Sequence, residues 1–162
     1  MSDYYPAEIS IGGPIHRRIL GRLIKKIVAE GASLHGYGEP AATKEALRAA
    51  FQDGQIVRIY DDRAHNGEFR ALEAFLVRQR IHFDRHSDAS CEYNAENVYY
   101  RGGDCPLVMV SDQGGNILYR HEDLTAILEH ESLNDHDKVA ALRKLLNPPE
   151  RAPLQPIHFV KE

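Results

Sequence analysis

Apolar and polar side chains follow two different periods along the first third of the chain. Residues 7–11 change character at nearly every position, as a half-buried strand does. Over residues 15–30, apolar side chains recur every three or four positions, which predicts an amphipathic helix. Gly31 stands where a left-handed residue commonly ends a helix, and Thr43 stands where an N-cap commonly begins one. The pattern therefore predicts a strand followed by two helices.

Strand patterns dominate the middle of the chain, and helical patterns return in its last third. Glycine pairs at 102–103 and 114–115 separate three short apolar runs, which predicts hairpin connections. Asn134 precedes apolar residues at helical spacing and is expected to cap a helix that Pro148 ends. Residues 61–67 are expected to form a polar loop. The predicted strands cover residues 55–60, 81–86, 96–101, 106–111, 116–120 and 154–160, and the later predicted helices cover 67–80, 123–130 and 134–146.

This order of elements predicts an α+β protein. Strand–helix–strand units are expected to build a single-domain sandwich over residues 1–162, with helices packed on a mixed, mainly antiparallel sheet. A domain of this length buries roughly two-thirds of the surface of its unfolded chain, so it needs no stabilising disulfide. The residues expected in one core are Ile19, Leu23, Ile27, Phe51, Ile59, Leu72, Phe75, Phe83, Val108 and Leu142.

Charge and cysteine content narrow the classes of partner. The net charge of −4 argues against general nucleic-acid binding, which needs a dominant basic surface. No apolar run is long enough to span a membrane, and the first residues lack the features of a secretory signal. Cys91 and Cys105 are expected to be reduced thiols, as they would be in the cytoplasm, which is the expected location.

Several catalytic motifs are absent or incomplete. No stretch has the glycine, lysine and hydroxyl spacing of a phosphate-binding loop, and no serine-hydrolase motif is present. Two His-Glu pairs, at 121–122 and 130–131, match the first half of a zinc-protease motif. Thr125 and Asn134 stand where that motif requires its second histidine, so neither pair completes it. The absence of these motifs favours binding over catalysis.

The sequence IHFDRHSD, residues 81–88, carries the clearest candidate chemistry. On a strand, His82, Asp84 and His86 share one face, and Asp88 extends it. Imidazole and carboxylate groups bind zinc, manganese or iron, and adjacent members of this row could share one ion. The same groups could instead act as acid and base without a metal, or simply face water. Further metal ligands would have to come from Asp61, Asp62, Asp88, Glu92, Cys91 or Cys105.

Three functions follow as hypotheses from these patterns. The first is a small binding or regulatory module that has no catalytic activity and no resident cofactor. The second is a metal-assisted, hydrolase-like enzyme centred on His82, Asp84 and His86, with a divalent metal as its cofactor. The third is nucleic-acid binding through the basic residues of the first helix, which are Arg17, Arg18, Arg22, Lys25 and Lys26.

Self-association is a further hypothesis. Val98, Tyr99 and Tyr100 belong to a predicted strand close to glycine-rich turns. Tyrosine is enriched at protein interfaces, and strand edges can pair with a second copy of the same chain. A homodimer through this hairpin is therefore one prediction, whereas the sequence names no small-molecule ligand.

Overall fold

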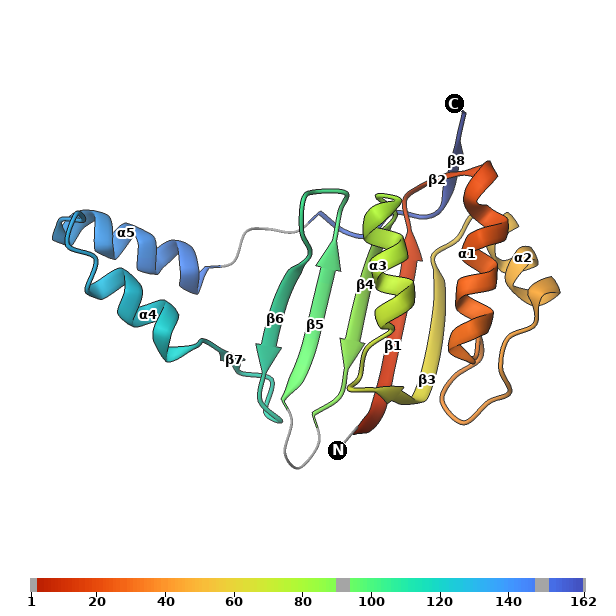
Figure 1. Cartoon of the computed structure of the whole chain (residues 1–162), viewed down its shortest axis with the longest axis horizontal. Helices are drawn as coiled ribbons and strands as arrows, with labels where there is room; N and C mark the ends of the chain where they lie inside the picture. Colours follow the sequence, from red (N-terminus) through yellow and green to blue (C-terminus); the bar gives the residue numbers. More distant parts are fainter. Residues whose placement is uncertain (1–2, 90–93, 148–151, 162) are drawn as a thin grey trace.

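A six-stranded antiparallel sheet forms the centre of the fold (Figure 1). The structure, a computed structural model, describes residues 3–89, 94–147 and 152–161. The strands lie in the order β3-β1-β4-β5-β6-β7, so the N-terminal strand is inside the sheet and not at its edge. Their bounds are Tyr4–Gly12 for β1, Val57–His65 for β3, His82–Ser87 for β4, Ala95–Tyr100 for β5, Leu107–Ser111 for β6 and Ile117–Leu118 for β7. A separate parallel ribbon joins β2, Pro14–His16, to β8, His158–Val160.

Three helices form a layer on one face of this sheet, and two others lie beyond its β7 edge (Figure 1). The layer consists of α1, Arg17–Glu30, with α2, Lys44–Gln52, and α3, Arg70–Arg78, packed beside it. The other pair, α4, His121–Leu128, and α5, Asp135–Leu146, forms a helical hairpin that we call the arm. This arrangement confirms the predicted α+β sandwich, with its one parallel strand pair outside the main sheet. None of the described helices is both long and apolar enough to cross a bilayer.

The hydrophobic core lies between the sheet and the layer of three helices. Alternate strand residues point into it, as Ile9 and Ile11 do from β1 and Phe83 does from β4. The apolar stripe of α1 supplies the opposite wall, where Leu23 and Ile27 are fully buried. Each such side chain contributes roughly 1.5–3 kcal/mol when removed from water, so this contact holds the layers together.

Two of the ten residues expected in this core lie outside it. Val108 on β6 is 52% exposed because α3 lies over β1 and β4, away from that part of the sheet (Figure 1). Leu142 is only partly buried because α5 belongs to the arm. The other eight are buried. The predicted dimer surface was also wrong in part, since Val98 and Tyr100 point into the core and are 4% and 2% exposed.

Local signals located the ends of most elements. The side chains of Thr43 and Asn134 cap α2 and α5 by accepting backbone N–H groups at 3.2 and 2.9 Å. Gly31 ends α1 with the expected left-handed φ of 75°. The predicted loop at 61–67 was wrong over most of its length, because β3 continues to His65 by pairing with β1 beyond a bulge. The first two residues of the predicted first helix belong instead to β2.

One charged side chain lies within the core. Arg85 on β4 points toward the helices, and its side chain is 3% exposed. Its Nε lies 3.0 Å from Oε1 of Glu73 on α3, and its Nη2 forms an ion pair with Glu96 on β5. Its Nη1 donates to the carbonyl oxygen of Gly67 at 2.9 Å. Burial raises the pKa of Glu73, and the Arg85 guanidinium opposes that rise. A single cation thus joins α3, two strands and the turn before α3.

Arg85→Ala should lower the free energy of unfolding by about 3–5 kcal/mol, because it leaves the buried Glu73 carboxylate without its cation. Adding Glu73→Gln to that variant should recover part of the loss, since the uncompensated charge is then gone. Arg48→Ala, at an exposed position of α2, is the control and should change stability by less than about 0.5 kcal/mol. Urea unfolding measures all three. A loss below about 1 kcal/mol for Arg85→Ala would contradict the role given to this cation.

The C-terminal segment, residues 152–161, packs against the end of β1. Gly13 donates its N–H to the carbonyl oxygen of Gln155 at 2.8 Å and accepts from the N–H of His158 at 3.1 Å. The backbone of Gln155 also lies so close to Gly12 that a Cβ there would be 2.3 Å from its carbonyl oxygen. The neighbouring Ile157 is buried in the core. Gly12 is therefore required because a second chain segment passes directly over it.

Gly12→Ala should lower the free energy of unfolding by about 1–3 kcal/mol, because the new methyl group must push the 152–161 segment away. Gly21→Ala is the matched control, since nothing lies within 4 Å of a Cβ at that position in α1. The control should gain about 0.5–1 kcal/mol from helix propensity alone. In thermal unfolding, Gly12→Ala should lower the melting temperature and Gly21→Ala should raise it. A rise in both variants would contradict the close approach at Gly12.

Candidate functional site

The polar row of β4 lies on the sheet face opposite the helices. His82, Asp84 and His86 are partly exposed and alternate with the buried Phe83 and Arg85, so they share one face as predicted. This face has no layer of α1, α2 and α3 on it, because the core lies on the other side. The cross-strand neighbours of the row are Gly12, Ser10 and Glu8 on β1 and Tyr99 and Asn97 on β5.

Asp84, in the middle of the row, is held by an arginine. Nη1 of Arg101 lies 2.6 Å from one carboxylate oxygen of Asp84, and Nη2 donates to the other at 3.1 Å. The same guanidinium donates to the carbonyl oxygens of Phe83 and Ala152 at 3.1 and 2.9 Å. The ion pair therefore connects β4 to the C-terminal segment. A metal ion at Asp84 would have to compete with this cation for both oxygens.

The two histidines of the row have different surroundings. Nδ1 of His86 lies 2.9 Å from the side-chain oxygen of Asn97, and its Nε2 lies 3.1 Å from a carboxylate oxygen of Asp88. The ring of His82 instead packs closely against Gly13, which lies between β1 and β2. Burial, followed by the charges of Arg101 and His158, lowers the pKa of His82. The row thus consists of three separate interactions and not of one cluster.

A loop tyrosine lies near the far end of this face. Tyr37 packs edge-on against Tyr60 of β3, with ring centroids 5.3 Å apart. Burial, together with the negative charges of Glu8 and Asp88, raises the pKa of Tyr37 to about 12. Its hydroxyl is protonated at neutral pH and can donate a hydrogen bond.

The metal hypothesis gains no support from this geometry. Within residues 3–89, 94–147 and 152–161, no three His, Cys, Asp or Glu side chains are grouped so that they could hold one ion. Cys105 is exposed, while Cys91 and Glu92 lie outside the described residues. Metal binding by His82, Asp84 and His86 stays a prediction.

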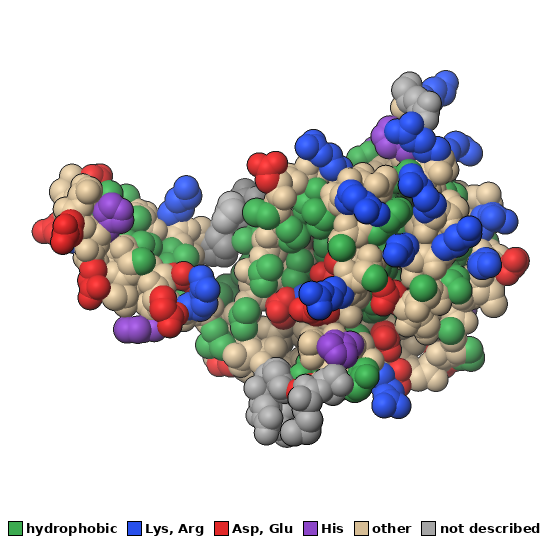
Figure 2. Space-filling view, viewed as in Figure 1, with side chains coloured by type: hydrophobic (Ala, Val, Ile, Leu, Met, Phe, Trp, Pro, Cys, Tyr) green, Lys and Arg blue, Asp and Glu red, His purple; other side chains and the backbone are tan. Residues whose placement is uncertain are grey.

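The basic residues of the first helix lie opposite its buried stripe, as predicted. Arg17, Arg18, Arg22 and Lys25 are exposed, and Lys26 is partly buried. Figure 2 shows Lys and Arg side chains gathered on this side of the molecule. No acidic residue occupies the first turn of α1 to offset them. The basic surface is therefore present, and nucleic-acid binding through it stays a prediction.

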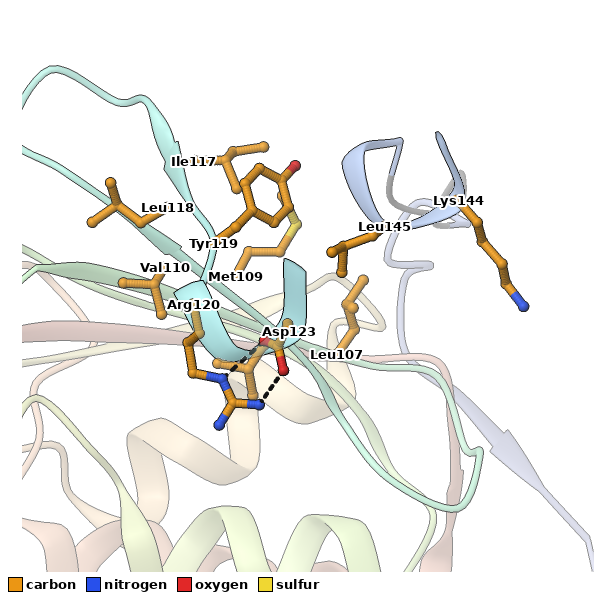
Figure 3. A pocket seen from close by; sticks show the side chains of 11 residues that line it. Leu107, Met109, Val110, Ile117, Leu118, Tyr119, Arg120, Asp123, Lys144 and Leu145 are labelled. Carbon is orange, nitrogen blue, oxygen red and sulfur yellow. Dashed lines mark hydrogen bonds and ion pairs between the residues drawn. The ribbon is translucent and has the colours of Figure 1, made fainter. Parts of the chain in front are cut away.

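A second candidate site, not foreseen from the sequence, is an apolar cleft between the end of the sheet and the arm (Figure 3). Its volume is about 550 Å³, within the range of sites that bind small molecules or peptide side chains. Figure 3 shows Tyr119 and Met109 side by side, with Leu107 and Leu145 facing them across the opening. The lining residues are Leu107, Val108, Met109, Val110, Ile117, Leu118, Tyr119, Arg120, Asp123, Lys144 and Leu145.

Backbone at the start of β6 borders this cleft. β7 pairs only with Val110 and Ser111, so in the described part of the chain Leu107 and Val108 have no strand on their outer side. The opposite edge of the sheet is partly paired. There, the backbone of Ser33 forms two hydrogen bonds, of 2.8 and 2.9 Å, with the backbone of Tyr60 on β3. A strand edge that has no neighbour over part of its length can pair with another chain.

A hydrogen bond to the end of α5 and an ion pair at the start of α4 border the cleft. The hydroxyl of Tyr119 donates to the carbonyl oxygen of Leu146 at the end of α5, at 3.2 Å. Arg120 donates twice to Asp123, at 2.9 and 2.7 Å, and this pair marks one end of the opening in Figure 3. The cleft is therefore apolar along its walls and charged at its end.

Sequence reasoning missed the cleft because it assigned the run PLVMV to the core. The available signal was that this run is apolar on both strand faces and does not alternate, which is typical of a strand covered on both sides. Within the described residues, six of the nine large apolar side chains that are exposed fall between positions 108 and 146. None of the described residues supplies the cover that the pattern requires.

His82 should make stability depend on pH. Its lowered pKa means that the folded state binds a proton more weakly than the unfolded state does. The resulting stability is present above the ordinary histidine value of 6.5 and is lost as the pH falls below it. His82→Gln should therefore reduce the drop in unfolding free energy between about pH 7 and about pH 5. His121→Gln, on the exposed side of α4, is the control. Equal slopes for all three proteins would contradict this role.

Comparison of the chain with protein-family models, with curated proteins and with solved structures gave no match. No relative therefore indicates which of these surfaces is functional. The choice between them depends on burial, charge and unsatisfied contacts within the molecule itself.

Proposed function

We propose that the protein is a binding module whose cleft between β6, β7 and the arm receives an extended segment of another polypeptide. The observation that carries this proposal is the conjunction of an apolar cleft with an unpaired strand edge at Leu107 and Val108. An added strand would satisfy the free backbone groups of that edge, and its side chains would enter the cleft.

Apolar area at the end of the sheet supports a polypeptide as the ligand. Ile117 and Leu118 are about two-fifths exposed and Val108 is half exposed, and all three line the same cleft. Soluble proteins seldom leave such side chains in contact with water over a continuous surface unless the surface binds something. Figure 2 shows apolar side chains exposed over this end of the sheet.

The shape and polarity of the cleft distinguish this ligand from a small polar metabolite. A metabolite site usually has several convergent polar groups, whereas here the Arg120–Asp123 pair is satisfied internally by two hydrogen bonds. The walls offer mainly aliphatic side chains together with Met109, which adapts readily to ligands of different shape. These features favour side chains of a peptide over a charged substrate.

The polar row offers less support for catalysis. His82, Asp84 and His86 each bind a different partner, so they do not converge on one reacting atom. A binding module without catalytic activity is therefore the function that the geometry favours. The metal-assisted enzyme and the nucleic-acid-binding module remain the alternative hypotheses.

A fluorescently labelled peptide that copies residues 106–111, Pro-Leu-Val-Met-Val-Ser, flanked by lysines for solubility, should bind saturably in an anisotropy titration. β6 already pairs antiparallel with β5, so a strand of this composition is a suitable probe for its other edge. Val108→Glu should weaken binding about tenfold or more, because it places a carboxylate beside the apolar peptide. Val108 is half exposed, so this change leaves the core intact.

Two controls make the titration specific. Ile56→Glu changes an exposed apolar residue that does not line the cleft, and it should leave peptide affinity unchanged. A second peptide with proline in place of its methionine cannot complete a strand ladder and should bind more weakly. Absence of saturable binding to the unmutated protein would overturn the proposal, and equal binding of both peptides would rule out strand addition as its mode.

A further inference from the structure

The two helices of the arm bury no side chain completely. α4 has 8 residues and α5 has 12, and none of them is classed as buried. Helices of this length are marginal in water without tertiary contacts, so most of their stability must come from packing. Each contacts the other, and α5 contributes Lys144 and Leu145 to the wall of the cleft. The described residues of the arm therefore bury less than helices of this size require for stability.

An apolar stripe runs along one side of α5. Val139 and Leu146 are each 49% exposed and lie seven residues apart, with the partly buried Leu142 between them. This spacing of three and four residues is the seam along which two helices pack against one another. Leu128, at the end of α4, is 54% exposed and adds apolar area to the same hairpin. The stripe is distinct from the cleft, whose wall on α5 is formed by Lys144 and Leu145.

We propose that this stripe packs against the same stripe of a second copy of the chain, with the two α5 helices antiparallel. Such a contact is isologous, because one surface meets itself across a two-fold axis. A second copy is present wherever the protein is present and in equal amount, which suits a surface that needs permanent cover. The contact uses α5, whereas the hairpin predicted from Val98 and Tyr100 is unavailable since both are buried.

The charges of α5 favour an antiparallel arrangement of two copies. Asp135 lies in its first turn and Arg143 in its last turn, both next to the stripe on the helix surface, whereas Lys144 faces the cleft. In an antiparallel pair, the acidic end of each helix is beside the basic end of the other, whereas a parallel pair would place like charges together. The helix dipoles of an antiparallel pair also attract one another, which favours the same arrangement. The sign pattern of this one helix is therefore complementary to itself.

Light scattering coupled to size exclusion tests the proposal on the full chain. The unmutated protein should have twice the mass of its 18.3 kDa chain at about 100 μM, a concentration at which a micromolar dimer is nearly complete. Val139→Glu and Leu146→Glu should each raise the dissociation constant about tenfold or more, because they bury carboxylates in the seam. Val108→Glu, which alters the cleft, should leave the mass unchanged, so the two proposed surfaces are tested separately.

A charge exchange tests the orientation. Asp135→Arg alone and Arg143→Asp alone should each weaken association, because like charges then meet across the seam. The double variant carries both exchanges in each copy, so the opposite charges meet again and association should recover. Monomers of the unmutated protein at this concentration would overturn the proposal. A dissociation constant that is unchanged in Val139→Glu over a dilution series, or no recovery in the double variant, would overturn the antiparallel α5 contact. Urea unfolding of each variant confirms that the sheet domain remains folded.

Discussion

The guanidinium of Arg85 is the interaction on which the organisation of the fold depends. A cation buried to this extent is costly unless its charge and its donors are satisfied. Here one carboxylate comes from α3, a second comes from β5, and a backbone carbonyl comes from the turn that precedes α3. These partners belong to different elements, so the cation is satisfied only when the turn, α3 and both strands are in place. It specifies how α3 lies on the sheet, in addition to any stability that it contributes.

The two edges of the sheet are finished in different ways. At the β3 edge, a residue from the α1–α2 loop pairs with the strand and limits its ability to recruit another chain. At the β6 edge, β7 covers only two residues, and the arm stands beside an apolar cleft. The layer of α1, α2 and α3 covers the sheet from β3 to β5 and does not extend over β6 and β7. The molecule thus combines a well-covered body with one end whose apolar side chains stay exposed in the described residues.

Sequence patterns correctly predicted those features of the fold that depend on neighbouring residues in the chain. The caps at Thr43 and Asn134 and the end of α1 at Gly31 depend on a few neighbouring residues, and all three were located. The shared face of His82, Asp84 and His86 follows from the period of a strand, but their partners Arg101 and Asn97 come from another strand and have no local signal. The same alternation places Arg85 inside the core, and only the distant carboxylates explain why it is tolerated there. Val108 shows the other limit, because an apolar run indicates that a strand needs cover without indicating which molecule supplies it.

The pairing of β2 with β8 has a consequence for the time course of folding. Residues 14–16 pair with residues 158–160, so nearly the whole chain must be made before this ribbon can form. Contacts between such distant segments carry a large loop-closure cost and form late. Until then, the wall of the core near Ile15 is open to water, although the sheet and α1 can already assemble. The arm lies within the loop that this last step closes, and its apolar side chains Leu128, Val139 and Leu146 are exposed once α5 has formed. Chaperone contact and premature association are therefore most expected in the interval between the completion of α5 and the arrival of β8.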